Sequence, residues 1–261
     1  MAELENQVAL ITGAASGIDL EIARVFHREG AQLLLVDRNE DALKKAAREF
    51  QGPGHVHSFV ADVTRSEMVD AAVEEAARRF GKLDILVNGA GLNYAGRLLD
   101  IDDEHWHMLI DVMLHGAFYG IRAAARQMVK QKTGGKIVTL SSAASRVPLG
   151  GAIGYCTAKA AVNMVTRVAA VELGKHKIRV NAIAPGETMT PLIQRHLDQP
   201  GWKELVVRET PLRRMGETGD VAEMALFLAS DRSDWVTGQV FFVDGGQGLR
   251  GVDYEELMGS V

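Results

Sequence analysis

The segment VALITGAASGIDLEIA, residues 8–23, indicates how this chain folds. Its first four residues are apolar, as in a buried strand, and its last eight repeat apolar residues at helical spacing. Between them, Gly13 and Gly17 permit a tight turn that leads from strand to helix. Asp19 places a carboxylate in the first turn of the expected helix. The segment therefore predicts a strand, a glycine turn and a helix that begins with an acid.

The same alternation of short apolar runs and longer helical patterns continues along the chain. Strands that are apolar on both faces and joined by helices are typical of a parallel sheet covered on both sides. We therefore expect one doubly wound α/β domain over residues 1–261, with about seven parallel strands. The expected strands are residues 8–11, 33–36, 56–61, 85–88, 136–140, 179–183 and 240–243, and the expected helices are residues 17–29, 39–50, 66–80, 103–131, 154–174 and 219–229.

One long stretch, about residues 186–216, shows no regular pattern. Loops of this length in compact domains are usually functional lids or disordered segments. We expect a substrate loop whose apolar residues cover part of a pocket. The apolar residues in question are Met189, Leu192, Ile193, Leu197 and Trp202.

Composition narrows the possible partners. The formal net charge of −5 gives no basic field for nucleic acid or an anionic membrane surface, which favours a small-molecule partner. The N-terminus has no export pattern, and no window approaches the roughly eighteen apolar residues of a membrane span. The lone Cys156 suits a reducing compartment, so we expect a cytoplasmic protein. The eight histidines lack metal-ligand spacing, and no metal is expected.

Polar and glycine residues follow the strands, where a ligand lies in a parallel sheet. These segments are Thr12–Asp19, Asp37, Asp62–Val63, Asn88–Gly91, Ser141–Ser142 with Tyr155–Lys159, and Pro185–Thr190. Together with the ending TGQVFFVDGG (residues 237–246), they resemble the short-chain dehydrogenase/reductase family over nearly the whole chain. The resemblance implies a Rossmann-like fold and a nicotinamide dinucleotide cofactor.

The cofactor is expected to be NAD, with NADP less favoured. Glycines after a strand let the backbone approach a pyrophosphate at the positive end of the next helix. Asp37 would accept hydrogen bonds from the ribose hydroxyls and repel a 2′-phosphate, although Arg38 beside it weakens this preference. The cofactor-binding residues that the resemblance implies are Gly13, Ser16, Gly17, Ile18, Asp37, Asp62, Val63, Asn88, Tyr155, Lys159, Pro185, Gly186, Thr188 and Thr190.

Tyr155 and Lys159 lie four residues apart, so on a helix both side chains can reach one ligand. A nearby ammonium favours the phenolate, and we expect Lys159 to lower the pKa of Tyr155. The resemblance implies that Tyr155 is the acid/base, that Lys159 binds the nicotinamide ribose, and that Ser142 positions the substrate oxygen. The expected reaction is hydride transfer between nicotinamide and a secondary alcohol or ketone of unspecified structure. Thr188 and Thr190 match the segment that holds the carboxamide, or are simple capping threonines.

Two residues depart from the family pattern. Asp19 stands where the family has glycine, and at about 5 Å its charge would repel a pyrophosphate by roughly 3 kcal/mol unless the side chain turns outward. Met113 replaces the asparagine that supports a proton relay, or is a helix-core residue in an enzyme with another relay. The alternative function is therefore a non-catalytic binding or scaffold protein with an impaired cofactor site. Retention of Ser142, Tyr155 and Lys159 argues against it.

The resemblance also implies a homotetramer or homodimer. The long helices at about residues 103–131 and 154–174 would form the interface. Met128, Met164 and Val168 are the outward apolar residues that we expect there.

Overall fold

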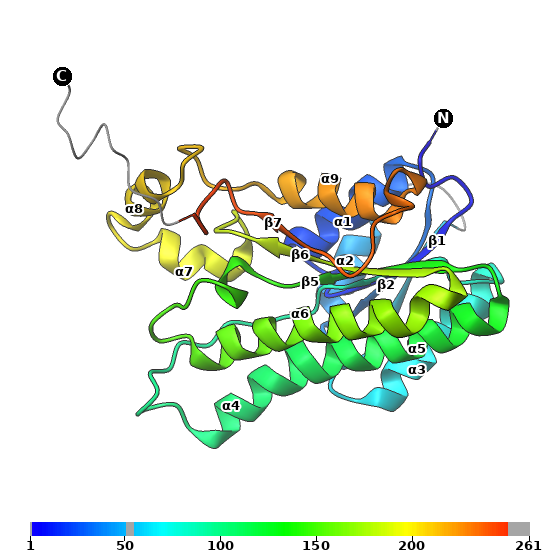
Figure 1. Ribbon diagram of the computed structural model, residues 1–261, viewed down its shortest axis with the longest axis horizontal. Coiled ribbons are helices and arrows are strands. Elements are labelled where there is room, and N and C mark those ends of the chain that lie inside the picture. Colours follow the sequence, from blue (N-terminus) through cyan, green and yellow to red (C-terminus); the bar gives the residue numbers. More distant parts are fainter. Residues whose placement is uncertain (1, 51–54, 250–261) are drawn as a thin grey trace.

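The computed structural model describes residues 2–50 and 55–249 and contains one seven-stranded sheet (Figure 1). All neighbouring strands are parallel, in the order β3-β2-β1-β4-β5-β6-β7. The predicted doubly wound α/β fold is confirmed. The strands are β1 Val8–Thr12, β2 Gln32–Asp37, β3 Val56–Val60, β4 Ile85–Asn88, β5 Gly135–Leu140, β6 Ile178–Pro185 and β7 Val240–Val243.

Helices cover both faces of the sheet (Figure 1). Helices α1, α2 and α9 lie on one face, and α3, α5 and α6 lie on the other. The elements match the expected ranges to within a few residues, and α3 matches its range at both ends. The α-helices outside residues 186–216 are α1 Gly17–Arg28, α2 Glu40–Ala47, α3 Ser66–Phe80, α4 Asp103–Ile110, α5 Gly116–Gln131, α6 Ile153–Leu173 and α9 Thr218–Ala229.

Alternate strand residues feed two hydrophobic cores, one on each face. Ile11 of β1 packs with Ile22 of α1 and Val221 of α9 on the first face. Leu10 packs on the second face with residues of α3 and α5. Because both sides of the central strands are buried, their sequences are apolar throughout. The sheet thus fixes the strand ends, where the polar segments emerge.

The expected helix at 103–131 is interrupted in the middle. Helix α4 ends at Ile110, a π-helical turn spans Asp111–His115, and α5 begins at Gly116. Met113 lies in this turn and is buried against Leu109 and Ala158. A π turn widens the helix by one residue and is often found at functional sites. It brings this part of the helix against α6.

The stretch expected to be irregular, residues 186–216, contains helices. A 3₁₀ turn at Pro191–Ile193 leads into α7, Gln194–Leu197, and α8 follows at Trp202–Glu209. These helices were not predicted because they are short and carry few buried residues. Figure 1 shows α7 and α8 together at one end of the molecule, beyond β6.

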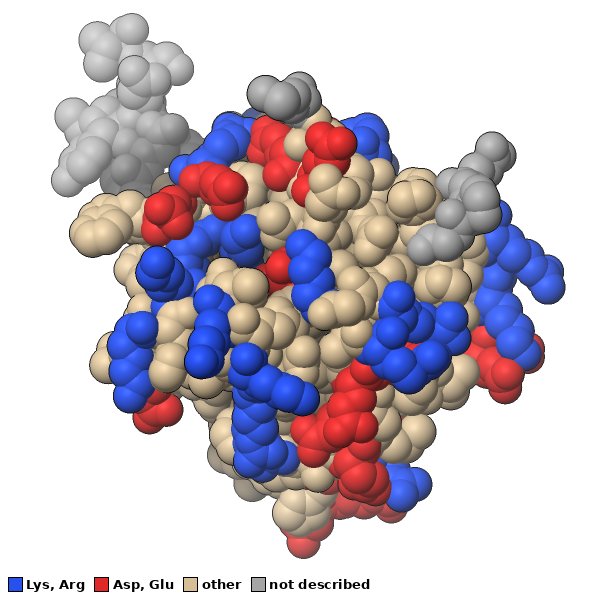
Figure 2. Space-filling view, turned by 90° about the vertical axis from the view of Figure 1, so that its right-hand side faces the viewer, with Lys and Arg blue, Asp and Glu red and all other residues tan. Residues whose placement is uncertain are grey.

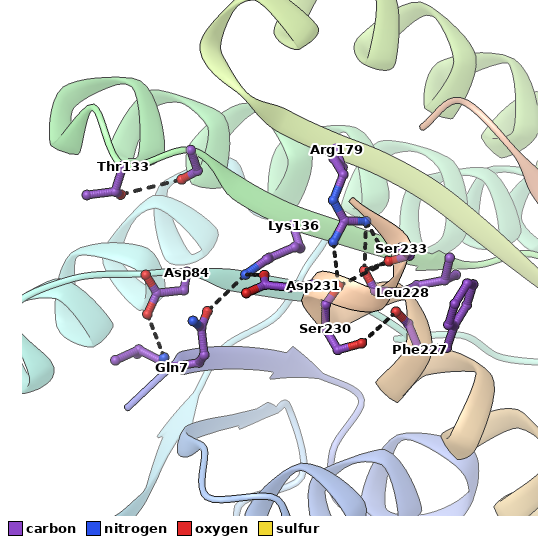
Figure 3. A network of polar contacts seen from close by, with 12 residues as sticks. Gln7, Asp84, Thr133, Lys136, Arg179, Phe227, Leu228, Ser230, Asp231 and Ser233 are labelled. Carbon is purple, nitrogen blue, oxygen red and sulfur yellow. Dashed lines mark hydrogen bonds and ion pairs between the residues drawn. The ribbon is translucent and has the colours of Figure 1, made fainter. Parts of the chain in front are cut away.

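A buried arginine joins β6 to the end of α9 (Figure 3). The Arg179 guanidinium donates to the Leu228 carbonyl (3.0 Å), the Ser230 carbonyl (2.9 Å) and the Ser233 hydroxyl (2.9 Å). Carbonyls at a helix C-terminus lack helical partners, and a cation satisfies them. Burial lowers the pKa of Arg179, and these acceptors compensate for its desolvation. Arg179 is a structural cation.

Charges of both signs lie side by side on the end of the molecule shown in Figure 2. Basic residues occupy the last turns of several helices, among them Arg28 of α1, Arg78 and Arg79 of α3, and Lys130 of α5. Glu75 pairs with both Arg78 and Arg79. Among the helices of the described residues, none is long and apolar enough to cross a membrane.

Candidate active site

A cleft of about 1050 Å³ opens at the carboxyl ends of the strands. It extends from the end of β2 to the segment that carries α7 and α8. A volume of this size suits a cofactor together with a small substrate. The predicted residues that line it are Gly13, Ser16, Gly17, Ile18, Asp37, Asp62, Val63, Ser142, Tyr155, Lys159, Pro185, Gly186, Thr188 and Thr190.

The turn after β1 forms one wall of the cleft. Gly13 and Gly17 have positive φ angles of 76° and 63°, which glycine adopts without strain. A Cβ at Gly13 would lie 2.9 Å from the Ala90 amide nitrogen, so a side chain does not fit there. At Gly17 the nearest atom to such a Cβ is the Thr190 methyl at 3.7 Å. The start of α1 therefore faces open space, as an anion site at a helix N-terminus requires.

Asp37 lies at the edge of the cleft, at the end of β2. Its carboxylate accepts hydrogen bonds from the Ala15 amide (3.3 Å) and the Asn39 amide (2.9 Å). These bonds hold the acid beside the turn after β1. Arg38 also lines this end of the cleft, so a cation and an acid are both available to a ribose substituent.

Asp62 is fixed by its own turn. Its Oδ1 atom accepts from the Thr64 amide (2.9 Å) and the Thr64 hydroxyl (2.8 Å). Asp62 and Val63 line the cleft on the side of β3, as expected for residues near an adenine ring.

Asn88 lies behind the wall of the cleft. Its side-chain amide donates to the Ala117 carbonyl (3.3 Å) and is buried between β4 and α5. It lines a separate small cavity with Thr12, Met113 and Lys159. The resemblance implies that Asn88 steadies the neighbouring strand ends near the cofactor, and its amide is used between these two elements, behind the residues that line the cleft.

Helix α6 places Tyr155 and Lys159 on the same wall. The Lys159 Nζ atom lies 5.9 Å from the centroid of the Tyr155 ring and donates to the Leu140 carbonyl (2.7 Å). Ser142 reaches this wall from the end of β5 and forms a hydrogen bond with Tyr155. Ser141, its neighbour, points inward and donates to the Lys159 carbonyl (3.2 Å). The structure thus brings Ser142, Tyr155 and Lys159 together.

The pKa of Tyr155 differs in direction from the lowering that we expected from Lys159. Burial raises the pKa of Tyr155, a hydrogen bond from Ser142 partly offsets this rise, and Glu187 adds to it. Burial lowers the pKa of Lys159 to about 8. The expected lowering of the Tyr155 pKa is therefore not seen in the free protein, because burial dominates and Lys159 is bonded to a carbonyl. Tyr155 is protonated at neutral pH and can act as an acid.

Asp19 turns inward, toward the cleft. Its side chain is 7% exposed and lies over Gly89, where a Cβ would overlap the carboxyl group. Its Oδ2 atom would be 3.1 Å from a Cβ at Gly13. Glycines on both sides thus make room for this acid. The possibility that the side chain turns away from the site is excluded.

The segment after β6 closes the cleft opposite α6. The Thr188 hydroxyl donates to the Gly186 carbonyl (2.9 Å), and Thr190 precedes the turn at 191–193 without a capping bond from its side chain. Pro185 is the last residue of β6. Both threonines line the cleft, so the alternative of simple capping residues does not describe them.

The apolar cover is confirmed only in part. Leu192, Ile193 and Trp202 line the cleft. Met189 and Leu197 do not line it; Met189 precedes the short helices and is 40% exposed. Sequence reasoning did not single out several residues that line this end, among them Glu187, His196, Leu205 and Glu209. A polar residue two positions after the apolar strand β6 was the signal for Glu187.

Glu187 is a half-buried acid of the cleft. Burial raises its pKa, and His196 acts in the opposite direction. The His196 ring lies 5.3 Å from the Trp202 ring. An acid, an imidazole and an aromatic ring thus face the same space as Tyr155.

The cleft fits a nicotinamide dinucleotide along most of its length. Asp37 and Asp62 stand at the end suited to adenosine, and the open start of α1 stands at the position of a diphosphate. Tyr155, Lys159 and Thr188 stand at the other end. The exception to this fit is Asp19, whose carboxyl faces the place that an anion would occupy.

Comparisons with known proteins agree with this site. A family model described as enoyl-(acyl carrier protein) reductase matches residues 13–247. The 3-oxoacyl-[acyl-carrier-protein] reductase FabG of Thermotoga maritima is 38% identical over 244 residues, which cover 93% of this chain and 98% of that protein. The chain belongs to the short-chain dehydrogenase/reductase family and is of the oxidoreductase class.

Two further relatives are named for activities on other substrates. The galactitol 2-dehydrogenase (L-tagatose-forming) of Cereibacter sphaeroides is 39% identical over 93% of this chain and 95% of its own length. A gluconate 5-dehydrogenase of Burkholderia cenocepacia, solved with NADP and tartrate, shares 35% identity and a TM-score of 0.89, with 94% of this chain and 96% of that chain covered. The family is therefore shared by proteins that act on different hydroxy compounds.

Proposed function

We propose that this protein transfers a hydride between NAD and a secondary alcohol or ketone. The observation that carries the proposal is the gathering of Ser142, Tyr155 and Lys159 on one wall of a cleft whose far end holds Asp37. A scaffold protein needs no such set of side chains. The bound cofactor would supply or accept the hydride, while the protein orients it.

Each of the three residues has a distinct part in the proposal. Ser142 would hold the substrate oxygen by a hydrogen bond next to Tyr155. Tyr155 would give its phenolic proton to that oxygen during ketone reduction and take a proton from the alcohol during oxidation. Lys159 would bind the ribose and stabilise the phenolate that forms when Tyr155 loses its proton.

The NAD preference rests on Asp37. A carboxylate held at the end of β2 by two amide groups would accept from the ribose hydroxyls and repel a 2′-phosphate. Arg38 and the NADP bound to the gluconate 5-dehydrogenase support the opposite preference. We retain NAD because Asp37, unlike Arg38, is anchored by the main chain.

The proposed substrate is a small or moderately apolar hydroxy compound. Leu192, Ile193 and Trp202 supply apolar contact, and Glu187 supplies an acid near Tyr155. This mixture favours a compound with both a carbon skeleton and a hydrogen-bond donor. The names of the dehydrogenases for galactitol and gluconate make such compounds the first to test.

We further propose that residues 1–261 act as one domain and that the protein is a cytoplasmic homotetramer or homodimer; residues 1, 51–54 and 250–261 lie outside the described part of this range. Met164 and Val168 on α6 are 56% and 49% exposed, which supports an interface there. Met128 is fully buried in the core and is withdrawn from that interface. A solution mass near 28.3 kDa by sedimentation would contradict the assembly.

The activity test is a panel of secondary alcohols and ketones assayed with NAD and NADP. Change in the absorbance of the nicotinamide reports turnover, and the Tyr155→Phe variant serves as the control. We expect turnover that depends on Tyr155. Cofactor binding without turnover on any compound of the panel would favour the scaffold function instead.

A further inference from the structure

The turn that would receive a dinucleotide contains a buried acid with an unused oxygen. Asp19 is the third residue of α1, and its side chain is 93% removed from solvent. Its Oδ1 atom has no hydrogen-bond partner among the described residues. Buried carboxyl oxygens are normally bonded, so an unbonded one is better tolerated in a neutral carboxylic acid than in a carboxylate. Asp19 itself lines the cleft.

The surroundings of Asp19 favour its neutral form. Burial is the largest influence and raises its pKa well above the usual value, and Asp37 at the end of β2 adds to the rise. Lys159 on α6 acts in the opposite direction. Gly89 and Gly13, which pack against the carboxyl group, bring no charge of their own. Burial is therefore the main reason that the neutral form is favoured, and Lys159 is the charged group that opposes it.

A bound diphosphate would change this balance. Its negative charges would lie beside the start of α1, the same place that the Asp19 carboxyl faces. An ionised Asp19 would repel them, while a neutral carboxylic acid can donate a hydrogen bond to a phosphate oxygen. The neutral form turns an unfavourable contact into a favourable one.

We propose that Asp19 is a proton-accepting cofactor-binding residue: the dinucleotide binds to the protonated acid, and binding takes up one proton at Asp19. This inference rests on the proposed function, because it assumes that the cleft binds a dinucleotide. It goes beyond that function in making cofactor affinity depend on pH through a single residue. Asp19, which replaces the family's glycine, thus makes the affinity for the dinucleotide depend on pH.

The pH dependence has a defined sign. At a pH where Asp19 is already protonated in the free protein, affinity does not change with pH. The next range lies between the pKa of Asp19 in the free protein and its higher pKa in the complex. There, affinity for the dinucleotide falls by up to tenfold for each unit that the pH rises. Above the range in which the complex also ionises, affinity becomes constant again at a lower value.

The test is calorimetric titration with NAD in pairs of buffers that differ in enthalpy of ionisation. The slope of the observed heat against that enthalpy gives the number of protons taken up. Measurements between about pH 5 and pH 7 stay below the pKa of about 8 at Lys159, so that this lysine remains charged. Asp19→Asn keeps the size of the side chain and removes the titration. Asp41→Asn removes an exposed carboxylate from the first turn of α2 and serves as the matched control.

The expected result, at a pH where Asp19 is ionised in the free protein, is an uptake of up to one proton per NAD in the wild type and in Asp41→Asn. The same uptake should be absent in Asp19→Asn. His196, which lines the substrate end of the cleft, is present in all three proteins and cancels in the comparison. Thermal melting of each variant without ligand checks that it is folded.

Two results would overturn the inference while leaving the proposed function intact. One is equal proton uptake in the wild type and in Asp19→Asn. The other is binding of NAD to Asp19→Gly but not to the wild type at any pH, since the acid would then only block the site. Failure of both the wild type and Asp19→Gly to bind NAD or NADP would overturn the proposed function together with the inference.

Discussion

The two ends of the cleft differ in how closely they follow the pattern of the family. On α6, Tyr155 and Lys159 lie together with Ser142, as their spacing and the resemblance imply. In the turn after β1, Asp19 takes the place of glycine and is buried over Gly89. The reacting end of the site is thus retained, while the end that would hold the diphosphate has acquired an acid.

This difference indicates that the residues at the reacting end and the residues at the diphosphate end can change in sequence independently of each other. Lys159 connects the two ends, because its charge acts on Asp19 and its side chain shares a wall with Tyr155. A change at Asp19 is therefore expected to alter cofactor affinity first and the chemistry only indirectly.

The largest expected effect is at the retained end. Tyr155→Phe should reduce kcat at least about 100-fold, since it removes the acid/base proton and keeps the ring. NAD affinity, measured by titration, should remain within about twofold, well under 1 kcal/mol. Retention of more than about a tenth of the activity would correspond to less than roughly 1.4 kcal/mol and would exclude an acid/base role.

Lys159→Met provides the contrast within the same wall. It should reduce both turnover and NAD affinity, because Lys159 would contact the ribose as well as stabilise the phenolate. Arg179→Met is the matched control, since Arg179 is also a buried cation but bonds only to the end of α9 and its following turn. That control should lower stability by about 3 kcal/mol or more. Loss of NAD affinity in a folded Arg179→Met protein would contradict the distinction between the two cations.

The next effect concerns the altered end. Asp19→Gly should tighten NAD binding by about 10- to 100-fold at a pH where Asp19 is ionised in the wild type, the scale set by a repulsion of roughly 3 kcal/mol. Asp19→Asn should recover part of this gain, because it removes the charge but keeps the bulk. The gain should shrink as pH falls and the wild-type acid becomes neutral. Equal affinities in all three proteins across the pH range would show that Asp19 has no contact with the cofactor.

A smaller effect is expected at the adenosine end. Asp37→Asn should raise the ratio of NADP to NAD affinity by about tenfold, or about 1.4 kcal/mol, since the repulsion of a 2′-phosphate is lost. Arg38→Ala should move the ratio in the opposite direction. Competitive titration of the two cofactors measures both changes. A wild-type preference for NADP would contradict the proposed specificity.

The smallest effect is on stability without ligand. The pKa of Asp19 is raised in the folded protein, so the acid favours folding at low pH, and this contribution is lost as pH rises through the folded-state pKa. The wild type should therefore lose stability relative to Asp19→Asn with rising pH, by at most about 1.4 kcal/mol per pH unit. Urea unfolding at several pH values measures the difference. A difference that is independent of pH would show that Asp19 has the same pKa in the folded and unfolded chains.

The sequence was sufficient for the fold and for the retained wall. Strand alternation predicted the parallel sheet, and the four-residue spacing predicted the shared face of Tyr155 and Lys159, because both depend on local geometry. The inward direction of Asp19 could not be predicted, since it depends on Gly89, which is 70 positions further along the chain. The same holds for the pKa of Tyr155, which is set by burial among distant elements.

The residues at the end of the cleft near α7 and α8 were the least predictable. Short helices α7 and α8 have few buried residues, so their pattern did not distinguish them from a loop. Met113 shows the same limit, because only the structure places it in a π-helical turn packed against Leu109 and Ala158. Its burial supports the interpretation as a helix-core residue.

The central claim is that this cleft binds a nicotinamide dinucleotide despite the acid in its turn. Calorimetric titration of the wild type and Asp19→Gly with NAD and NADP, at a pH near 5 and again near 7, tests it most directly. We expect one molecule of NAD per chain, tighter binding at the lower pH in the wild type, and little change with pH in Asp19→Gly. The absence of binding for both proteins and both cofactors at either pH would contradict the account.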